Sequence, residues 1–177
     1  MNSFMIAQLV GILSGIVSIV IVQFKKINHI LIGEILSNMT IAATYIFVGG
    51  ISGASLCAAA SIHTLVSFCY SKRQKKCPIA VTVLFEALYF ACSALSYKGF
   101  IDVLSCIAAM LFGLAVVQSS AAKYRILMLF NALLWVVYDI GTKAYTTTLT
   151  HSFIAVSILT AIIRIDILEA KKNKICE

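Results

Sequence analysis

Long apolar runs, separated by only short polar breaks, are the feature that most constrains how this chain can fold. Of its 177 residues, 61% are hydrophobic and 12% are charged, and the mean hydropathy is +1.00. A soluble domain carries about 25% charged residues, so this composition excludes a cytosolic enzyme, a nucleic-acid-binding protein and a secreted disulfide scaffold. The chain is therefore predicted to lie in a lipid bilayer.

Seven runs are long enough to cross a bilayer as a helix, which takes about 20 residues. They are Phe4–Phe24, Ile27–Gly49, Ile51–Tyr70, Ile79–Tyr97, Ile101–Ala121, Tyr124–Thr142 and Leu149–Leu168. We predict an all-α membrane protein with seven transmembrane helices. The break between the second and third runs is the least polar, and Gly49-Gly50 provides the backbone freedom for a tight turn there.

Lysine and arginine gather in alternate breaks between the runs, which predicts the orientation. Only Lys98 and Lys143 lie on one side of the membrane. The other side carries Lys25, Lys26, Lys72, Arg73, Lys75, Lys76, Lys123, Arg125, Lys171, Lys172 and Lys174. Because cytoplasmic loops are rich in cations, we expect the N-terminus outside and the C-terminus in the cytoplasm. The basic run 72–76 is then a topology signal rather than a nucleic-acid site.

Rare polar residues recur at an offset of 92 to 95 positions, which indicates an internal repeat. The recurring pairs are Gln23 and Gln118, Asn38 and Asn131, Tyr45 and Tyr138, and Gly49 and Gly141. Two three-helix bundles, residues 1–76 and 99–177, are then joined by a connector helix within residues 77–98. Because four helices separate equivalent elements, the repeat is parallel, as in some small transporters. Chance similarity between apolar helices is the alternative.

This 3+1+3 pattern, with Gln at the ends of the first and fifth runs, resembles the SWEET/PQ-loop superfamily, and more specifically the YgjV family of bacterial inner-membrane proteins. The stretches that carry the second resemblance are residues 7–12, 50–54, 62–65, 134–137 and 163–164. The resemblance implies a SWEET-like, sugar-transporter-like fold in the bacterial inner membrane, with His63 and Arg164 at two positions where that family has a basic residue. In the superfamily Pro usually precedes each Gln, whereas here Val22 and Val117 do. Gating would then use Gly11, Gly15 and Gly113 as hinges, or the protein does not cycle as a SWEET does.

Polar side chains at membrane depth are costly and usually face a cavity or a partner helix. Asn38 and Asn131 lie near the middle of their runs, so we predict that they meet in a pocket for a small polar solute. Glu34 shares a helical face with Asn38, and Trp135 shares one with Asn131. The alternative for both amides is a hydrogen bond to a neighbouring helix.

Several other polar residues have more than one interpretation or an expected structural role. Glu34 is a proton-coupled carboxylate, a partner of a base such as His63, or a protonated helix contact. His63 itself is a proton relay, part of the pocket, or a core histidine with its hydrogen bonds satisfied. Gln23 and Gln118 are expected to serve as gate or structural residues, as are Tyr45 and Tyr138 near the outer ends. Glu86 is expected to be a structural partner, and Asp139 to pair with Lys143.

No catalytic motif, metal-ligand spacing or phosphate-binding loop stands in the sequence. We therefore expect no enzymatic activity, no metal and no cofactor. Two functions remain: alternating-access transport of a small polar solute, and a non-transporting receptor or assembly protein with the same fold. The solute and the lipid bilayer are the expected partners, nucleic acid is not, and a homo-oligomer is left open.

Overall fold

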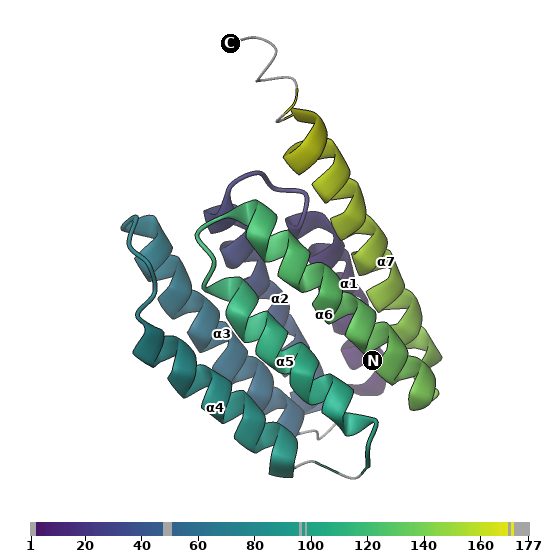
Figure 1. Ribbon diagram of the computed structural model, residues 1–177. Coiled ribbons are helices and arrows are strands. Elements are labelled where there is room, and N and C mark those ends of the chain that lie inside the picture. The colour runs from purple at the N-terminus through teal and green to yellow at the C-terminus, as the bar shows by residue number, and fades with distance from the viewer. Residues whose placement is uncertain (1–2, 48–50, 96, 98, 170, 172–177) are drawn as a thin grey trace.

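Seven α-helices make up nearly all of the described chain (Figure 1). The computed structural model describes residues 3–47, 51–95, 97, 99–169 and 171, apart from the side chains of residues 3–8, 45, 51–53, 146 and 169. The helices are α1 (Ser3–Ile21), α2 (Ile27–Phe47), α3 (Ile51–Lys72), α4 (Ile79–Leu95), α5 (Asp102–Val116), α6 (Ala121–Gly141) and α7 (Tyr145–Ala161), which continues into a π-helix, η1 (Ile162–Glu169). Each predicted run overlaps one of these helices.

The helix ends differ from prediction most at α5, α6 and α7, and α7 begins at Tyr145, four residues before the predicted Leu149. Within the predicted run Ile101–Ala121, α5 ends at Val116. Ser120 has extended backbone angles (φ −117°, ψ 130°) and caps α6, which therefore begins at Ala121, three residues before the predicted Tyr124. The predicted turn at Gly49-Gly50 lies outside the described residues. Within the described chain, three helical segments are long and apolar enough to cross a membrane by length and composition: Ala54–Lys72, Ala121–Gly141 and Thr147–Leu168. Three more are apolar but shorter: Leu9–Ile21, Ile79–Leu95 and Asp102–Val116.

α3 and α6 end in the same kind of hydrogen-bonded turn, with a left-handed residue just beyond the helix. Gln74 has φ 55° and Lys143 has φ 60°. After α6 the backbone N–H of Ala144 donates to the carbonyl of Asp139 at 2.8 Å, and that of Lys143 to the carbonyl of Ile140 at 3.1 Å. This is the Schellman arrangement, which satisfies the last carbonyls of a helix and usually places glycine at the left-handed position.

The helices pack in chain order within two groups of three. α2 lies between α1 and α3, and α6 lies between α5 and α7. The groups touch where α1 meets α7, where α3 meets α5 and where α2 meets α6, and α4 packs against α5 and α3. Figure 1 shows α5 and α6 in front of α1 and α2. A buried core forms where α1 and α5 end and α2 and α6 begin, with α7 beside them; its residues include Val22, Ile30, Leu31, Val116 and Ile158.

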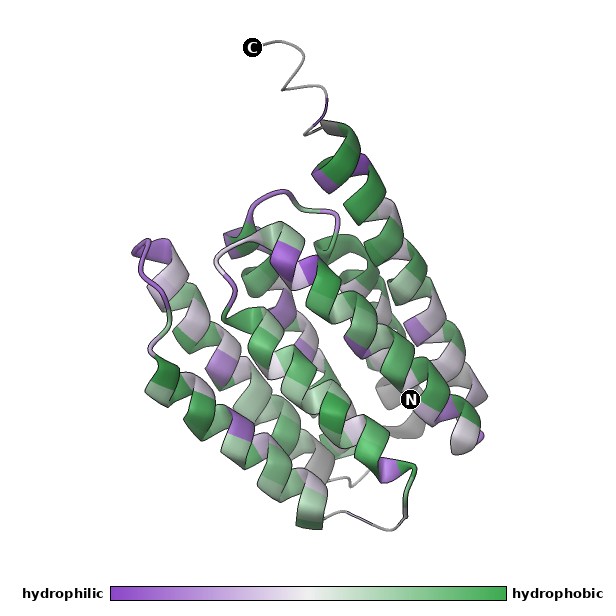
Figure 2. Ribbon diagram, in the orientation of Figure 1, coloured by the Kyte–Doolittle hydropathy of each residue, from purple (hydrophilic) through white to green (hydrophobic). Residues whose placement is uncertain are grey.

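The outer surface of the bundle is largely apolar, as a helix facing lipid requires. Figure 2 shows hydrophobic residues over most of each helix and hydrophilic residues in the loops. Large exposed side chains include Ile12, Leu36, Met39, Leu133 and Phe153. The loops after α1, α3 and α5 lie at one end of the bundle (Figure 1), which we call the basic end because it holds Lys25, Lys26, Lys72, Arg73, Lys75 and Lys76.

Candidate functional site

The two helix groups meet at a buried carboxyl–phenol pair near the basic end. Glu34 on the second turn of α2 and Tyr124 on the first turn of α6 are 6% and 0% exposed. The Tyr124 hydroxyl donates a hydrogen bond to Glu34 Oε1 at 2.5 Å. Of the roles expected for Glu34, pairing with His63 is therefore wrong, because the described partner of its side chain is Tyr124.

Arg125, next to Tyr124, is fully buried and closes the end of α1. Its Nε donates to the carbonyl of Val22 at 2.8 Å, and its Nη2 donates to the carbonyl of Phe24. These carbonyls follow the last turn of α1, where backbone acceptors lack partners within the helix and a cation is favourable. Arg125 Nη1 also forms an ion pair of 2.6 Å with Asp166 of η1. One side chain thus links α1, α6 and η1.

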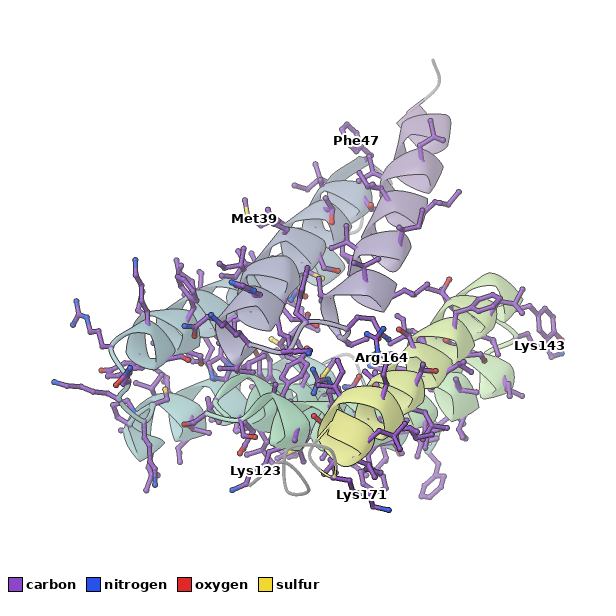
Figure 3. The ribbon with its side chains drawn as sticks, turned by 90° about the horizontal axis from the view of Figure 1, so that it is seen from above. Met39, Phe47, Lys123, Lys143, Arg164 and Lys171 are labelled. Carbon is purple, nitrogen blue, oxygen red and sulfur yellow. The ribbon has the colours of Figure 1, made fainter. Side chains whose placement is uncertain are left out.

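Gln23 connects the end of α1 to α7. Its Nε2 donates to both the carbonyl and the hydroxyl oxygen of Ser157, at 2.7 and 2.8 Å. The Ser157 hydroxyl donates in turn to the carbonyl of Ile19 at 2.7 Å, and Arg164 donates to Gln23 Oε1 at 3.0 Å. Arg164 is exposed, and Figure 3, a view from above, shows it on the side of η1 that faces α1.

Gln118, which the predicted repeat pairs with Gln23, makes a different contact. It lies two residues beyond the end of α5, and its Nε2 donates to the carbonyl of Leu114 in the last turn of that helix at 2.8 Å. It also lines a pocket of about 350 Å³ at the basic end, together with Lys76, Lys123 and Ser120. The two glutamines are therefore equivalent in sequence position but not in contacts.

The two central asparagines both donate to backbone carbonyls. Asn38 Nδ2 bonds to the carbonyl of Glu34 in its own helix at 2.9 Å. Asn131, which is buried, bonds through Nδ2 to the carbonyl of Ala108 on α5 at 2.6 Å. No contact between the two amides is among the described interactions, so their meeting in one pocket stays a prediction.

Trp135 and Tyr138 belong to an aromatic and acidic cluster at the opposite end of α6. The Trp135 ring stacks on His151 of α7, with centroids 5.6 Å apart, and meets Tyr138 edge-on at 5.4 Å. His151 Nδ1 lies 2.7 Å from Asp139 Oδ2. The expected pairing of Asp139 with Lys143 is thus replaced by pairing with His151, since the left-handed turn at Lys143 leaves that lysine exposed (Figure 3). The side chain of Tyr45 lies outside the described residues.

His63 lies apart from Glu34, on the side of α3 that faces the connector α4. Its ring stacks on Phe85 with centroids 4.2 Å apart, and its Nδ1 lies 3.1 Å from the Tyr89 hydroxyl. His63 Nε2 is buried without a hydrogen-bond partner in the described chain, as are both carboxyl oxygens of Glu86. Glu86 was expected to be a structural partner, but its carboxyl group contacts no described donor.

Sequence reasoning missed several residues that hold these contacts: Tyr89, Tyr124, Arg125, His151 and Ser157. Arg125 was counted only as a loop cation, although it lies inside the predicted run Tyr124–Thr142. A cation inside an apolar run is itself a signal, because such a residue needs a partner. His151, inside the predicted run Leu149–Leu168, offered the same signal, whereas Tyr89, Tyr124 and Ser157 carry none in spacing or composition.

Comparison with known proteins identifies the family. No curated protein and no solved structure matches the chain. A family model described as "Bacterial inner membrane protein", Imp-YgjV, matches residues 5–169, which is most of the 177 residues. The resemblance inferred from short apolar stretches is thereby confirmed at the level of this family. The chain belongs to the YgjV family of bacterial inner membrane proteins.

Proposed function

We propose that the protein transports a small polar solute across the bacterial inner membrane by alternating access between the groups α1–α3 and α5–α7, with α4 as the connector. The observation that carries this proposal is the buried Glu34–Tyr124 hydrogen bond, which joins α2 of one group to the equivalent helix α6 of the other. Ionisable residues inside a membrane are costly and tend to mark solute or proton pathways.

The helix contacts support a parallel, SWEET-like repeat. Exchanging α1, α2 and α3 with α5, α6 and α7 converts the α1–α7 contact into the α3–α5 contact and leaves the α2–α6 contact in place. That is the relationship of two groups about a two-fold axis, and such a repeat creates an interface at which transporters bind solutes. The axis would pass between α2 and α6.

The hydrogen bonds at the basic end support a closed gate on that side. Glu34 with Tyr124, Arg125 with the end of α1, and Gln23 with Ser157 all join one group to the other there. By the positive-inside rule this end faces the cytoplasm, with the N-terminus outside. In this proposal the protein is closed toward the cytoplasm, and opening that side requires these hydrogen bonds to break.

The solute would lie just beyond this gate, toward the middle of the membrane. Asn38 is one turn past Glu34 on α2, and Asn131 is two turns past Tyr124 on α6. Amide groups both donate and accept hydrogen bonds, which suits hydroxyl and amine groups of a small metabolite. Each amide would exchange its present backbone carbonyl for the solute when the groups separate. His63 and Trp135 also contact other side chains in this structure. They would reach the solute only if the separation of the two groups released those contacts.

A non-transporting receptor or assembly protein is the second candidate, and a specific observation favours it. Both central amides and the Trp135 ring are already engaged by protein atoms, namely the carbonyls of Glu34 and Ala108 and the ring of His151. A protein that keeps these contacts permanently would use the fold as a rigid scaffold.

Solute flux into proteoliposomes tests the proposal. Uptake of a panel of labelled monosaccharides and neutral amino acids is compared for wild type, Asn38→Ala and Asn131→Ala. Met39→Ala and Phe130→Ala are matched controls, because these neighbours are 58% and 55% exposed on the outer surface, and Figure 3 shows Met39 pointing away from the bundle. We expect at least one solute to enter with wild type and the controls but not with the asparagine variants. Equal flux in all five proteins contradicts the solute site.

A further inference from the structure

The connector helix α4 carries a carboxyl group that is buried against α5. Both oxygens of Glu86 are inaccessible to solvent and have no hydrogen-bond partner in the described chain. A Cβ atom added at Gly113 of α5 would overlap Glu86 Oε1 and would lie 2.9 Å from Tyr89 Cε2. The carboxyl group therefore sits directly on the backbone of α5, and only glycine at position 113 leaves room for it.

A second set of buried polar groups lies on the other side of Tyr89. His63 is fully buried, with Nδ1 bonded to the Tyr89 hydroxyl at 3.1 Å and Nε2 without a partner. The Ser67 hydroxyl, one turn after His63 on α3, is also buried without a partner. Cys57 of α3 is the other titratable group near Tyr89. Tyr89 itself is 2% exposed and lies between His63 and Glu86.

The charge state of Glu86 follows from these surroundings. An ionised carboxylate buried in an apolar environment needs donors or a cation to offset its lost hydration. The described residues of α3, α4 and α5 place no lysine, arginine or N–H donor on the Glu86 oxygens. A protonated carboxylic acid is neutral and fits this environment at far lower cost.

We propose that Glu86 is a proton-binding site that makes the connector helix an active element of the protein. In this structure the carboxyl group holds the proton. Release to water gives a carboxylate plus a free proton, and the carboxylate then requires a donor. Tyr89, three residues later on the same helical face, carries a hydroxyl group that is hydrogen-bonded to His63 Nδ1 here.

Deprotonation therefore exchanges one hydrogen bond for another. The Tyr89 hydroxyl moves from His63 Nδ1 to Glu86, which loosens α4 from α3 and draws it onto α5. Since α4 packs against one helix of each group, this exchange changes how the groups are held together. That this exchange drives solute movement rests on the proposed transport function. The binding of a proton by Glu86 does not rest on it.

Chemical labelling of the purified full-length protein in liposomes tests this site without any solute. Dicyclohexylcarbodiimide, an apolar reagent, modifies protonated carboxyl groups within membranes, and peptide mass spectrometry distinguishes Glu86 from Glu34. We expect an adduct on Glu86 at neutral pH that is lost at alkaline pH. Glu86→Gln should lose this adduct, and Glu34→Gln should keep it.

An infrared spectrum decides the outcome independently of reagent access. In a Glu34→Gln background, which removes the other buried glutamate, we expect the carbonyl stretch of a protonated carboxylic acid, which the further Glu86→Gln substitution removes and which disappears as the pH is raised. A protein in which Glu86→Gln leaves the carboxylic acid band unchanged overturns the proposal. If the protein shows the Glu86 band but transports no solute, the transport proposal is contradicted and the proton site is not. If it transports a solute but shows no Glu86 band, the proton site is contradicted and transport is not.

Discussion

The hydroxyl group of Tyr124 donates a hydrogen bond to Glu34 Oε1 across the contact between α6 and α2, although the two residues are 90 positions apart in the chain. Both side chains are buried. The bond joins the first turn of α6 to the second turn of α2, so it links the two three-helix groups.

Tyr124→Phe removes the donor of this bond and leaves the buried carboxyl group without it. A buried acceptor deprived of its partner costs about 1–3 kcal/mol, so we expect the variant to unfold at lower temperature in detergent. Tyr145→Phe is the control, because Tyr145 is 67% exposed. Equal melting temperatures for the two variants would show that the Glu34 contact contributes nothing to stability.

Arg125→Met removes three interactions and leaves Asp166 unpaired. Breaking a buried ion pair from one side costs about 3–5 kcal/mol, and Arg125 is fully buried while Asp166 is 17% exposed. We expect a larger loss of stability than for Lys123→Met, whose lysine is exposed two residues earlier. In a double-mutant cycle measured by thermal unfolding, adding Asp166→Leu should recover part of the loss. Additive losses would mean that the pair is not coupled.

Comparing Gly33→Ala with Gly11→Ala distinguishes a glycine needed for close helix packing from one that makes a helix flexible. A Cβ at position 33 would overlap Ile21 Cγ2, whereas a Cβ at position 11 would meet only Thr44 Cγ2 at 3.8 Å. Overpacking costs about 1–3 kcal/mol, so Gly33→Ala should destabilise the protein. Gly11→Ala should leave stability unchanged or raise it by about 0.5–1 kcal/mol. If Gly11 is a hinge, the same variant slows flux without lowering the melting temperature.

Lys143→Gly should stabilise the protein, because Lys143 has a left-handed backbone with φ 60°. The left-handed conformation costs a non-glycine residue about 1–2 kcal/mol, and the larger entropy of glycine in the unfolded chain offsets part of that gain. Lys123→Gly, on α6, is the reverse control and should lose about 1 kcal/mol of helix stability. A lower melting temperature for Lys143→Gly would contradict the turn geometry after α6.

The seven helices and the family could be predicted because both depend on local properties of the sequence. Helix formation in a membrane follows from the length of an apolar run, and α1 to α7 each overlap a predicted run. The end of α5 was missed because Val117 and Ser120 end and restart the helix through backbone angles, with no proline or charge between them. The π-helix over Ile162–Glu169 likewise has no marker in composition.

The partners of the polar residues could not be predicted from spacing. Asn131 was placed correctly inside its helix, but only the packing of α5 on α6 directs its amide to the carbonyl of Ala108. Arg125 meets carbonyls more than a hundred positions away. The predicted repeat does not give these contacts either, because Gln23 bonds to α7 while Gln118 bonds to the last turn of the preceding helix, α5.

Solvent access to the two central amide positions tests the transport account most directly. In a cysteine-free background, Asn38→Cys and Asn131→Cys are exposed to a charged, membrane-impermeant thiol reagent in sealed vesicles. Leu36→Cys and Leu133→Cys, whose leucines are 56% and 47% exposed on the outer surface, are the lipid-facing controls. The account predicts that both asparagine positions react and that neither control does. Unreactive cysteines at positions 38 and 131 would mean a dry, permanently packed interface and would contradict it.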